Sequence, residues 1–459
     1  MIRSMKTTTT VLAVCASLSC FPGRFDDLEK ETWVQFVDRD NDTLNGDIGF
    51  DVAPMDLATG TAKGGVFIVA SQGVGGVTQV TIDESGGVSG RVSAAGNANV
   101  QGGLVPLNNQ DIFTVAPFAV SGQITGFVAG QPRNATVNAT SMIFNGLAAK
   151  FQSGITGGIQ VGPSGLQEFG NDILVGDFGS GLATPDIIVL GAASITVVTG
   201  ASNYATSHTC RLLRPNFPTS FAMGFKNAAL APIKANGKNQ LIVSGVDDDN
   251  LPKIFVFEGT DIVDSLTQCP TSTTMTVGTA LEKPPIAIAV GDFDGTTGLD
   301  LVTGTSTDVP AGTPGKVQIY RNINFASPPT PVAIVPVMAD QASPLYGSRL
   351  LIDDVDNDGT NELVVGDPST SVNAVTGAGR IYVFSLGAQT CTDTRGTGIC
   401  LEESLWAPEP GTDNHYGRAM ATTTYKTAKG TKRILGVGER NKLNVYFRVN
   451  ASAADPREL

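Results

Sequence analysis

"YGSRLLIDDVDNDGTNELVVGDP", Tyr346 to Pro368, is the stretch on which the fold prediction rests. Five acidic residues stand between Asp353 and Glu362, and an apolar run follows them directly. Close pairs of like charges repel by roughly 1–4 kcal/mol each, depending on the effective dielectric. The loop therefore calls for a compensating cation, and the apolar run after it predicts a buried β-strand.

Alternate residues of a tightly turning loop can point at one centre. All-oxygen ligands with flexible geometry favour Ca²⁺, and the residue at position 7 then contributes its backbone carbonyl. Gly359 permits the sharp turn. The sequence therefore predicts a Ca²⁺ site, with a metal-free cluster of Asx turns as the alternative. Positions 1, 3, 5, 7 and 9 of the loop are Asp354, Asp356, Asp358, Thr360 and Glu362.

Similar loops recur along the chain. The loop that begins at Asp292, 62 residues before Asp354, carries three carboxylates. We therefore expect weaker Ca²⁺ binding there, and a metal-free cluster of Asx turns is again the alternative. The Asp177 loop, a further 115 residues earlier, is one residue too long for a complete site. Midway between the Asp177 and Asp292 loops, Lys234 stands where the first Asp of the loop is expected. The acidic run Asp247–Asn250 follows a predicted strand instead of preceding one, so it predicts a solvated turn. The ligand positions of the weaker site are Asp292, Asp294, Thr296, Gly298 and Asp300.

The rest of the 459-residue chain fits the same repeat. Many runs of four to six apolar residues rich in Val and Ile, 54 Gly and 25 Pro predict an all-β protein. A period near 60 residues gives seven units between residues 31 and 450, and a closed radial arrangement hides their edge strands. The prediction is a seven-bladed β-propeller. Six or eight blades remain open because residues 100–165 have strand character but no clear motif.

The quoted stretch, followed by "GAGRIYVF", resembles an FG-GAP repeat of the integrin α-subunit propeller and related bacterial surface proteins. Tyr346-Gly347 matches the opening aromatic-Gly pair, and Phe169-Gly170 and Tyr416-Gly417 are further pairs. The resemblance touches about two thirds of the chain. It implies Ca²⁺ loops and a role in adhesion or in recognition of a protein or glycan at the cell surface, through loops on the face away from the Ca²⁺ loops.

The N-terminus has the order of a secretory signal: Arg3 and Lys6, an apolar segment, then small residues. We expect a signal at residues 1–20, a linker at 21–30, the propeller at 31–450 and a tail at 451–459. Ser17 to Cys20 resembles a bacterial lipobox, although Ser17 stands where Leu is usual. The prediction is an exported protein at the cell surface, outer membrane or periplasm, with a lipid on Cys20 as its only membrane contact.

Six cysteines are present, and cleavage before Cys20 would remove Cys15. Four then remain in the body of the protein. Cys391 and Cys400 flank a short polar loop and are predicted to form a disulfide, and Cys210 and Cys269, 59 positions apart, are the candidates for a second pair. Four buried thiols are the alternative, which an exported protein makes less probable.

Composition excludes some functions. A net charge of −13 and a sequence pI near 4.6 argue against a nucleic-acid partner, which needs a basic face. The chain has two His residues and neither a G-x-S-x-G elbow nor a Walker loop, so its motifs do not favour an enzyme. Two alternatives to the binding module stay open: a surface hydrolase or polysaccharide lyase using a carboxylate pair in the propeller cleft, and a structural envelope component.

Overall fold

The computed structural model is all-β, as predicted, and no helix occurs among the residues that it describes. No described segment is a helix long and apolar enough to cross a membrane. The described residues are 33–37, 47–55, 64–72, 76–82, 88–94, 113–120, 123–131, 140–145, 158–161, 170, 172–178, 185–191, 194–198, 209–213, 226–234, 238–247, 249, 251–259, 272–275, 283–296, 298–305, 315–323, 331–335, 343–386, 398–427 and 430–447.

The described strands form seven antiparallel sheets of four strands each, and within six of them the strands follow chain order. The first three sheets contain β2 (Asp47–Pro54), β3 (Gly65–Gln72), β4 (Gly76–Ile82) and β5 (Val88–Ala94); β6 (Thr114–Val120), β7 (Gln123–Gln131), β8 (Thr140–Asn145) and β9 (Gly158–Val161); and β10 (Asp172–Gly176), β11 (Asp186–Leu190), β12 (Ser194–Val198) and β13 (Thr209–Leu213).

The next three sheets include the two that carry the Asp292 and Asp354 loops. They are β14 (Ala228–Ala231), β15 (Gln240–Val246), β16 (Pro252–Glu258) and β17 (Ser272–Met275); β18 (Ala287–Gly291), β19 (Asp300–Thr305), β20 (Lys316–Tyr320) and β21 (Pro331–Val335); and β22 (Arg349–Asp353), β23 (Glu362–Asp367), β24 (Arg380–Leu386) and β25 (Ile399–Leu405).

The seventh sheet joins the two ends of the described chain. The first strand, β1 (Trp33–Val37), pairs with the last strand, so the sheet order is β1-β28-β27-β26. An N-terminal strand that completes a C-terminal sheet ties together segments that are far apart in the sequence. The other strands of this sheet are β26 (Ala419–Thr427), β27 (Gly430–Glu439) and β28 (Lys442–Phe447).

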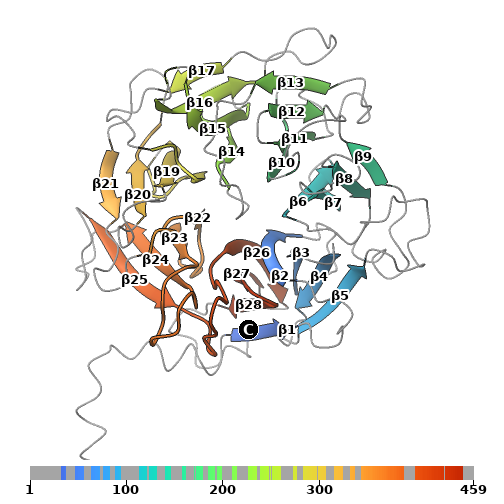
Figure 1. Ribbon diagram of the computed structural model, residues 1–459, viewed down its shortest axis with the longest axis vertical. Helices are drawn as coiled ribbons and strands as arrows, with labels where there is room; N and C mark the ends of the chain where they lie inside the picture. Colours follow the sequence, from blue (N-terminus) through green and yellow to red (C-terminus); the bar gives the residue numbers. More distant parts are fainter. Residues whose placement is uncertain are drawn as a thin grey trace, which may run out of the picture.

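Figure 1 shows the seven sheets arranged around a common centre, with one end strand of each sheet innermost. These innermost strands contact one another in chain order, from β2 through β6, β10, β14, β18 and β22 to β26, and β26 in turn contacts β2. Each sheet therefore has a neighbour on both sides.

Apolar side chains fill the spaces between neighbouring sheets. Leu363 and Val365 of β23 pack with Val302 of β19, while Val364, on the other face of β23, packs with Val437 of β27. This alternation is what a strand buried on both faces requires. Six of the seven spaces hold a cluster of this kind or part of one, and at the remaining junction the rings of Phe50 and Phe113 meet edge to face at 5.0 Å.

Two glycines show how closely the sheets approach. A Cβ on Gly304 of β19 would lie 1.9 Å from the carbonyl oxygen of Gly347, which precedes β22. A Cβ on Gly438 of β27 would lie 2.3 Å from the carbonyl oxygen of Gly49 in β2. Only glycine fits where one backbone lies directly against the next sheet.

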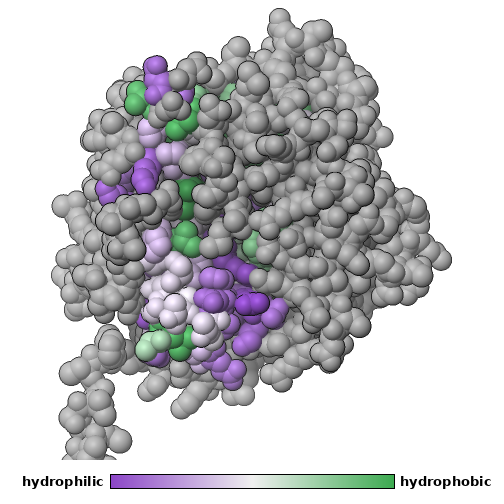
Figure 2. All heavy atoms as spheres, viewed as in Figure 1, coloured by the Kyte–Doolittle hydropathy of each residue, from purple (hydrophilic) through white to green (hydrophobic). Residues whose placement is uncertain are grey.

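Residues 100–165, which carry no recognisable motif, contribute the sheet β6–β9. Among the large apolar side chains of the described residues, only Leu251 is strongly exposed, at 52%. In Figure 2, hydrophilic side chains gather over the part of the face where Figure 1 draws β26–β28.

Candidate metal centres

The Asp354 loop connects the first two strands of its sheet, β22 and β23. Val355, the second residue of the loop, is 2% exposed and packs into the apolar space between β23 and β27. Its N–H donates to Glu362 Oε2 at 2.9 Å, and Glu362 is the first residue of β23. A buried apolar side chain and a buried carboxylate thus hold the two ends of the loop together.

Three carboxylates converge inside this loop. Oxygens of Asp354, Asp356 and Glu362 lie within 4.8 Å of one another and form a group that could hold a metal ion. They occupy positions 1, 3 and 9 of the predicted ligand set. The structure does not bring Asp358 into this group. The Asp358 carboxylate instead accepts the Thr360 N–H at 2.8 Å and the Thr360 hydroxyl at 2.6 Å.

The loop backbone also surrounds the carboxylates with N–H donors. Asp354 accepts the N–H groups of Asp358 and Gly359 at 3.1 Å each, and Asp356 accepts the Asp358 N–H at 3.1 Å. Asn357 and Gly359 have positive φ values of 61° and 92°, which let the chain turn this tightly. These bonds are the Asx turns of the metal-free alternative, and they also fix the carboxylates in place for a cation.

The environment of Glu362 disfavours its charged form. Burial, and then the nearby charge of Asp356, raises the pKa of Glu362 to about 8. The side chain is 1% exposed. A carboxyl group in such a site is stabilised either by a proton or by a cation placed between it and its acidic neighbours.

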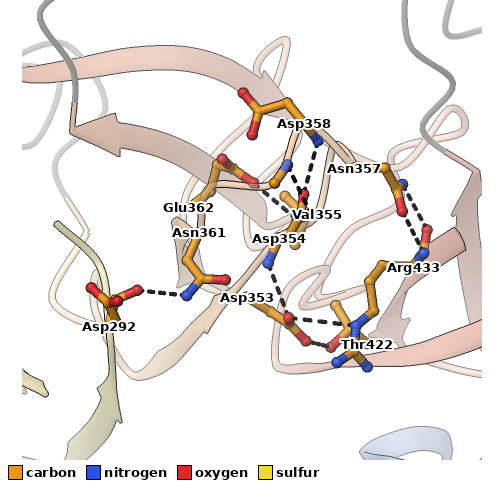
Figure 3. A network of polar contacts seen from close by, with 11 residues as sticks. Asp292, Asp353, Asp354, Val355, Asn357, Asp358, Asn361, Glu362, Thr422 and Arg433 are labelled. Carbon is orange, nitrogen blue, oxygen red and sulfur yellow. Dashed lines mark hydrogen bonds and ion pairs between the residues drawn. The ribbon is translucent and has the colours of Figure 1, made fainter. Parts of the chain in front are cut away.

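Neighbouring sheets hold the Asp354 loop on both sides (Figure 3). On one side Asn361 Nδ2 donates to the backbone oxygen of Asp292 at 2.5 Å. On the other, Asn357 exchanges two hydrogen bonds with the backbone of Arg433, donating at 3.1 Å and accepting at 2.5 Å. Asp353 accepts the Thr422 hydroxyl and lies 3.7 Å from Arg433 Nε. The loop is thus positioned by contacts with the two sheets next to its own.

The Asp292 loop is built in the same way between β18 and β19. Asp292, Asp294 and Asp300 bring carboxylate oxygens within 4.8 Å of one another. Phe293 is buried, and its N–H donates to Asp300 Oδ2 at 2.9 Å, matching Val355 and Glu362 in the other loop. Burial raises the pKa of Asp300.

The remaining two residues of the predicted ligand set, Thr296 and Gly298, make contacts within the loop and with Asn322. Thr296 donates its N–H to Asp294 at 3.0 Å, and its hydroxyl also donates to Asp294. Gly298 has a φ of 156° and lies directly against the side-chain oxygen of Asn322. Neither belongs to the converging carboxylate group.

Two further loops have the same hydrogen bond to the first residue of the second strand, but they differ at the acidic positions. Phe178 donates its N–H to Asp186, the first residue of β11, at 3.0 Å, and Lys234 donates its N–H to Gln240, the first residue of β15, at 3.1 Å. A buried acceptor at the start of the second strand is therefore common to four sheets. Residues 179–184 of the Asp177 loop lie outside the described residues. We expect metal ligation only where acids also stand at positions 1 and 3, as in the Asp354 and Asp292 loops.

The structure tests some smaller predictions. Asp247 accepts the N–H groups of Asp249 and Leu251 in the turn between β15 and β16, which confirms the turn. Cys400 in β25 is disulfide-bonded. Cys20, Cys269 and Cys391 lie outside the described residues, and of Cys210 only the backbone, in β13, is described.

An ion-pair network on the innermost strands was not predicted. Lys226 Nζ lies 2.8 Å from Asp51 Oδ2 and 2.9 Å from Asp172 Oδ1, and donates to the Thr114 hydroxyl at 2.7 Å. The two carboxylates are 4% and 2% exposed. Asp51 also accepts the N–H of Val115. Lys226 thus joins residues from three other sheets, those of β2, β6 and β10.

A sequence signal for these charges exists. Each of these charged residues stands two residues after a glycine, in "GFDV", "GNDI", "GFKN" and "GSRL". The first lies within its innermost strand, and the other three begin or precede theirs. Arg418 follows Gly417 by one residue. The charges carry different signs, so a search for acidic repeats does not find them. The charged residues of the four segments are Asp51, Asp172, Lys226 and Arg349.

Sequence comparison adds no relative: no protein-family model matches the chain, and no curated protein matches it. Solved structures do match. A chain of "Apo ctPRC2 in an autoinhibited state" has a TM-score of 0.52 and 8% identity over 92% of this chain and 98% of that one. A chain of a second ctPRC2 structure has a TM-score of 0.51 and 9% identity over 91% and 97%. At such identities the likeness shows the fold alone and does not bear on the FG-GAP resemblance.

Proposed function

We propose that the seven sheets are the blades of a β-propeller built from FG-GAP-like repeats. Its support is the cyclic contact of the innermost strands, the pairing of β1 with β28, and the acidic loop placed between the first two strands of two adjacent sheets. A fold of this kind leaves only short, protected sheet edges.

The proposed function is a Ca²⁺-stabilised binding module rather than an enzyme. The observation that carries the metal assignment is the repeated convergence of carboxylates at positions 1, 3 and 9 in the Asp354 and Asp292 loops. An all-oxygen donor set in a flexible loop fits Ca²⁺. Extracellular Ca²⁺ modules bind at about 10⁻⁴–10⁻³ M, so millimolar Ca²⁺ adds only about 0.4–1.4 kcal/mol per site. The ion would order the loops.

Replacing Asp356 with alanine is the direct test of this assignment. Asp356 belongs to the converging group, so Asp356→Ala is expected to lower the melting temperature in millimolar Ca²⁺ and to change it little in chelator. The measurement is thermal unfolding of the purified chain in both conditions. Wild type should gain stability from Ca²⁺, and the variant should gain less.

Asp247→Ala is the matched control, because Asp247 accepts N–H groups in a turn and belongs to neither carboxylate group found among the described residues. Its effect should be the same with Ca²⁺ and with chelator. An Asp356→Ala effect that is likewise independent of Ca²⁺ would leave only the Asx-turn interpretation of the loop.

Ligand binding is assigned to the face away from the Ca²⁺ loops. Because β22 runs into the Asp354 loop and β23 returns, the segments 368–379 and 406–418 lie at the opposite end of the sheet. They contact each other through the N–H of Asp413, which donates to Thr376, and that of His415, which donates to Gly377. The scarcity of exposed large apolar side chains among the described residues favours a polar protein or glycan ligand. Saturable binding on a glycan and protein panel without turnover supports this, whereas turnover would favour the enzyme.

Export and lipid anchoring complete the proposal. Residues 1–20 lie outside the described residues, and the proposal rests on their sequence. Replacing the proposed lipid-bearing residue, Cys20→Ser, is expected to release the protein from the membrane fraction of the producing cell. Fractionation followed by immunoblotting measures this. Unchanged membrane association would contradict the anchor and leave the metal assignment untouched.

A further inference from the structure

Asp367 is a buried carboxyl at the point where a strand becomes a loop. It is the last residue of β23 and is 0% exposed, and the segment 368–379 begins directly after it. Strand alternation places its side chain on the same face as Leu363 and Val365, which pack against the sheet β18–β21. The carboxyl therefore lies between two sheets, at the end opposite the Asp354 loop.

The polar neighbours of Asp367 compensate its burial only in part. Burial raises the pKa of Asp367 from 3.8 to about 7, although the Ser343 hydroxyl, the Arg380 charge and the Ser369 N–H oppose this effect. Neither carboxylate oxygen completes a hydrogen bond of normal geometry within the described part of the chain. An ionised carboxylate in this position is poorly solvated, and its charge is disfavoured there.

The charged groups of the same sheet lie on both of its faces. Arg380 is the register partner of Asp367 on β24, and its guanidinium lies 4.7 Å from the centre of the Trp406 ring. Arg349 on β22 is the register partner of Gly366, so it belongs to the other face of the sheet. Arg380 is the charged residue that acts on the Asp367 carboxyl.

Two groups from outside this sheet approach the same junction. His415 Nδ1 lies 3.1 Å from the backbone oxygen of Pro368. On the preceding sheet the N–H of Gly315 donates to the backbone oxygen of Ser343 at 2.9 Å, and Lys316 follows it as the first residue of β20. A pH-dependent change at this junction thus has two titratable candidates near neutral pH, Asp367 and His415.

The segment after Asp367 contains a strained turn. Val372 and Val375 exchange two backbone hydrogen bonds around Asn373 and Ala374, whose φ values are 51° and 66°. Glycine is the usual residue at the second position of such a turn, and a positive φ is unfavourable for alanine. Asn373 and Ala374 are both exposed. A segment of this kind opens more easily than a strand that is paired on both sides.

This segment is docked on the segment 406–418. The N–H groups of Asp413, His415 and Tyr416 donate to the backbone oxygens of residues 376, 377 and 378 at 2.9–3.0 Å. A cavity of about 30 Å³ is lined in part by Pro368 and His415, so packing is incomplete beside the residue that follows Asp367. A shift of Pro368 would therefore be transmitted to both segments.

We propose that Asp367 is a pH-sensitive switch that controls the docking of the segments 368–379 and 406–418. While the carboxyl is neutral, the two segments stay together. When it ionises, the segment 368–379 moves away and water reaches the carboxylate. This movement disturbs less structure than separating β23 from β22 and β24. The switch depends on neither Ca²⁺ nor the identity of a ligand.

Low pH favours the docked arrangement. The buried carboxyl keeps its proton up to about pH 7, whereas a solvated one releases it near 3.8, so opening releases a proton. The opening equilibrium constant should therefore rise about tenfold per pH unit between about pH 5 and about pH 7 and level off above that.

Hydrogen exchange of the full chain, followed by mass spectrometry, measures this opening. Rates at each pH are divided by the intrinsic rates of unstructured peptides. In wild type, protection of both segments is expected to fall about a hundredfold from about pH 5 to about pH 7. Asp367→Asn, which keeps the neutral form, should retain protection at both pH values. Asp413→Asn is the matched control, because it removes an exposed carboxyl from the docked segments, and it should behave like wild type.

Ala374→Gly tests the same opening with the carboxyl in place. It removes the strain of the turn, so it should raise protection at every pH and leave the pH dependence unchanged. Wild-type protection that does not change between the two pH values overturns the proposal. A pH dependence that persists in Asp367→Asn also overturns it, because another group, such as His415, would then be responsible.

Discussion

Lys226→Met is expected to destabilise the protein by about 3–5 kcal/mol, because it leaves two buried carboxylates without their cation. Asp51 and Asp172 lie 2.8 and 2.9 Å from Lys226 Nζ and are almost fully buried. The loss should be visible as an earlier midpoint in urea unfolding at neutral pH. Because the network joins the innermost strands of several sheets, the unfolding transition should move as a whole.

Lys253→Met is the matched control. Lys253 lies 3.7 Å from Asp247 in a partly exposed pair, and such pairs contribute about 0–1 kcal/mol. Adding Asp51→Asn and Asp172→Asn to the Lys226→Met chain should recover part of the lost stability. If the two lysine variants lose the same amount, the central network does not have the role assigned to it.

The loss in Lys226→Met should also depend on pH. Burial raises the pKa of Asp172, and Lys226 opposes this effect. Without the lysine the folded-state pKa rises further above the value in the unfolded chain. The stability linked to the protonated carboxyl is present at low pH and is lost as the pH rises through the folded-state pKa. The stability lost in Lys226→Met relative to wild type should therefore be smaller at about pH 5 than at about pH 8.

Gly304→Ala is expected to destabilise the protein by about 3 kcal/mol or more, since a methyl group there would lie 1.9 Å from the Gly347 carbonyl oxygen of the next sheet. Backbone cannot move aside as a flexible side chain does, so β19 and β22 must separate. The loss is measured by chemical unfolding.

Gly398→Ala is the comparison, because its added methyl group meets no atom within 4 Å and only its positive φ of 81° is strained. Its loss should be about 1–2 kcal/mol. Equal losses in the two variants would mean that contact between the sheets is looser than Gly304 indicates.

Much of the fold could be predicted from local signals. Short runs rich in Val and Ile predicted β-strands, and the acidic loops marked the point where the second strand of a sheet begins. Residues 100–165 could not be parsed, because the sheet β6–β9 has neither the acids nor the aromatic-Gly pair that mark several of the other repeats. The pairing of β1 with β28 has no local signal either, since it joins segments about 400 residues apart.

The candidate metal centres were predicted in part. The alternate spacing identified Asp354, Asp356 and Glu362, but it also included Asp358, whose carboxylate accepts hydrogen bonds from Thr360. Which acids converge depends on turn geometry, and spacing alone does not contain it. The central charges were missed because attractive pairs between distant residues leave no acidic run to notice.

The central claim is that a divalent cation joins the carboxylates of the Asp354 loop. A crystal structure determined with ample Ca²⁺ tests it most directly. The account predicts an anomalous peak with carboxylate oxygens of Asp354, Asp356 and Glu362 at about 2.3–2.6 Å from its centre. Only water at this position, with the carboxylates held by backbone N–H groups alone, would contradict it.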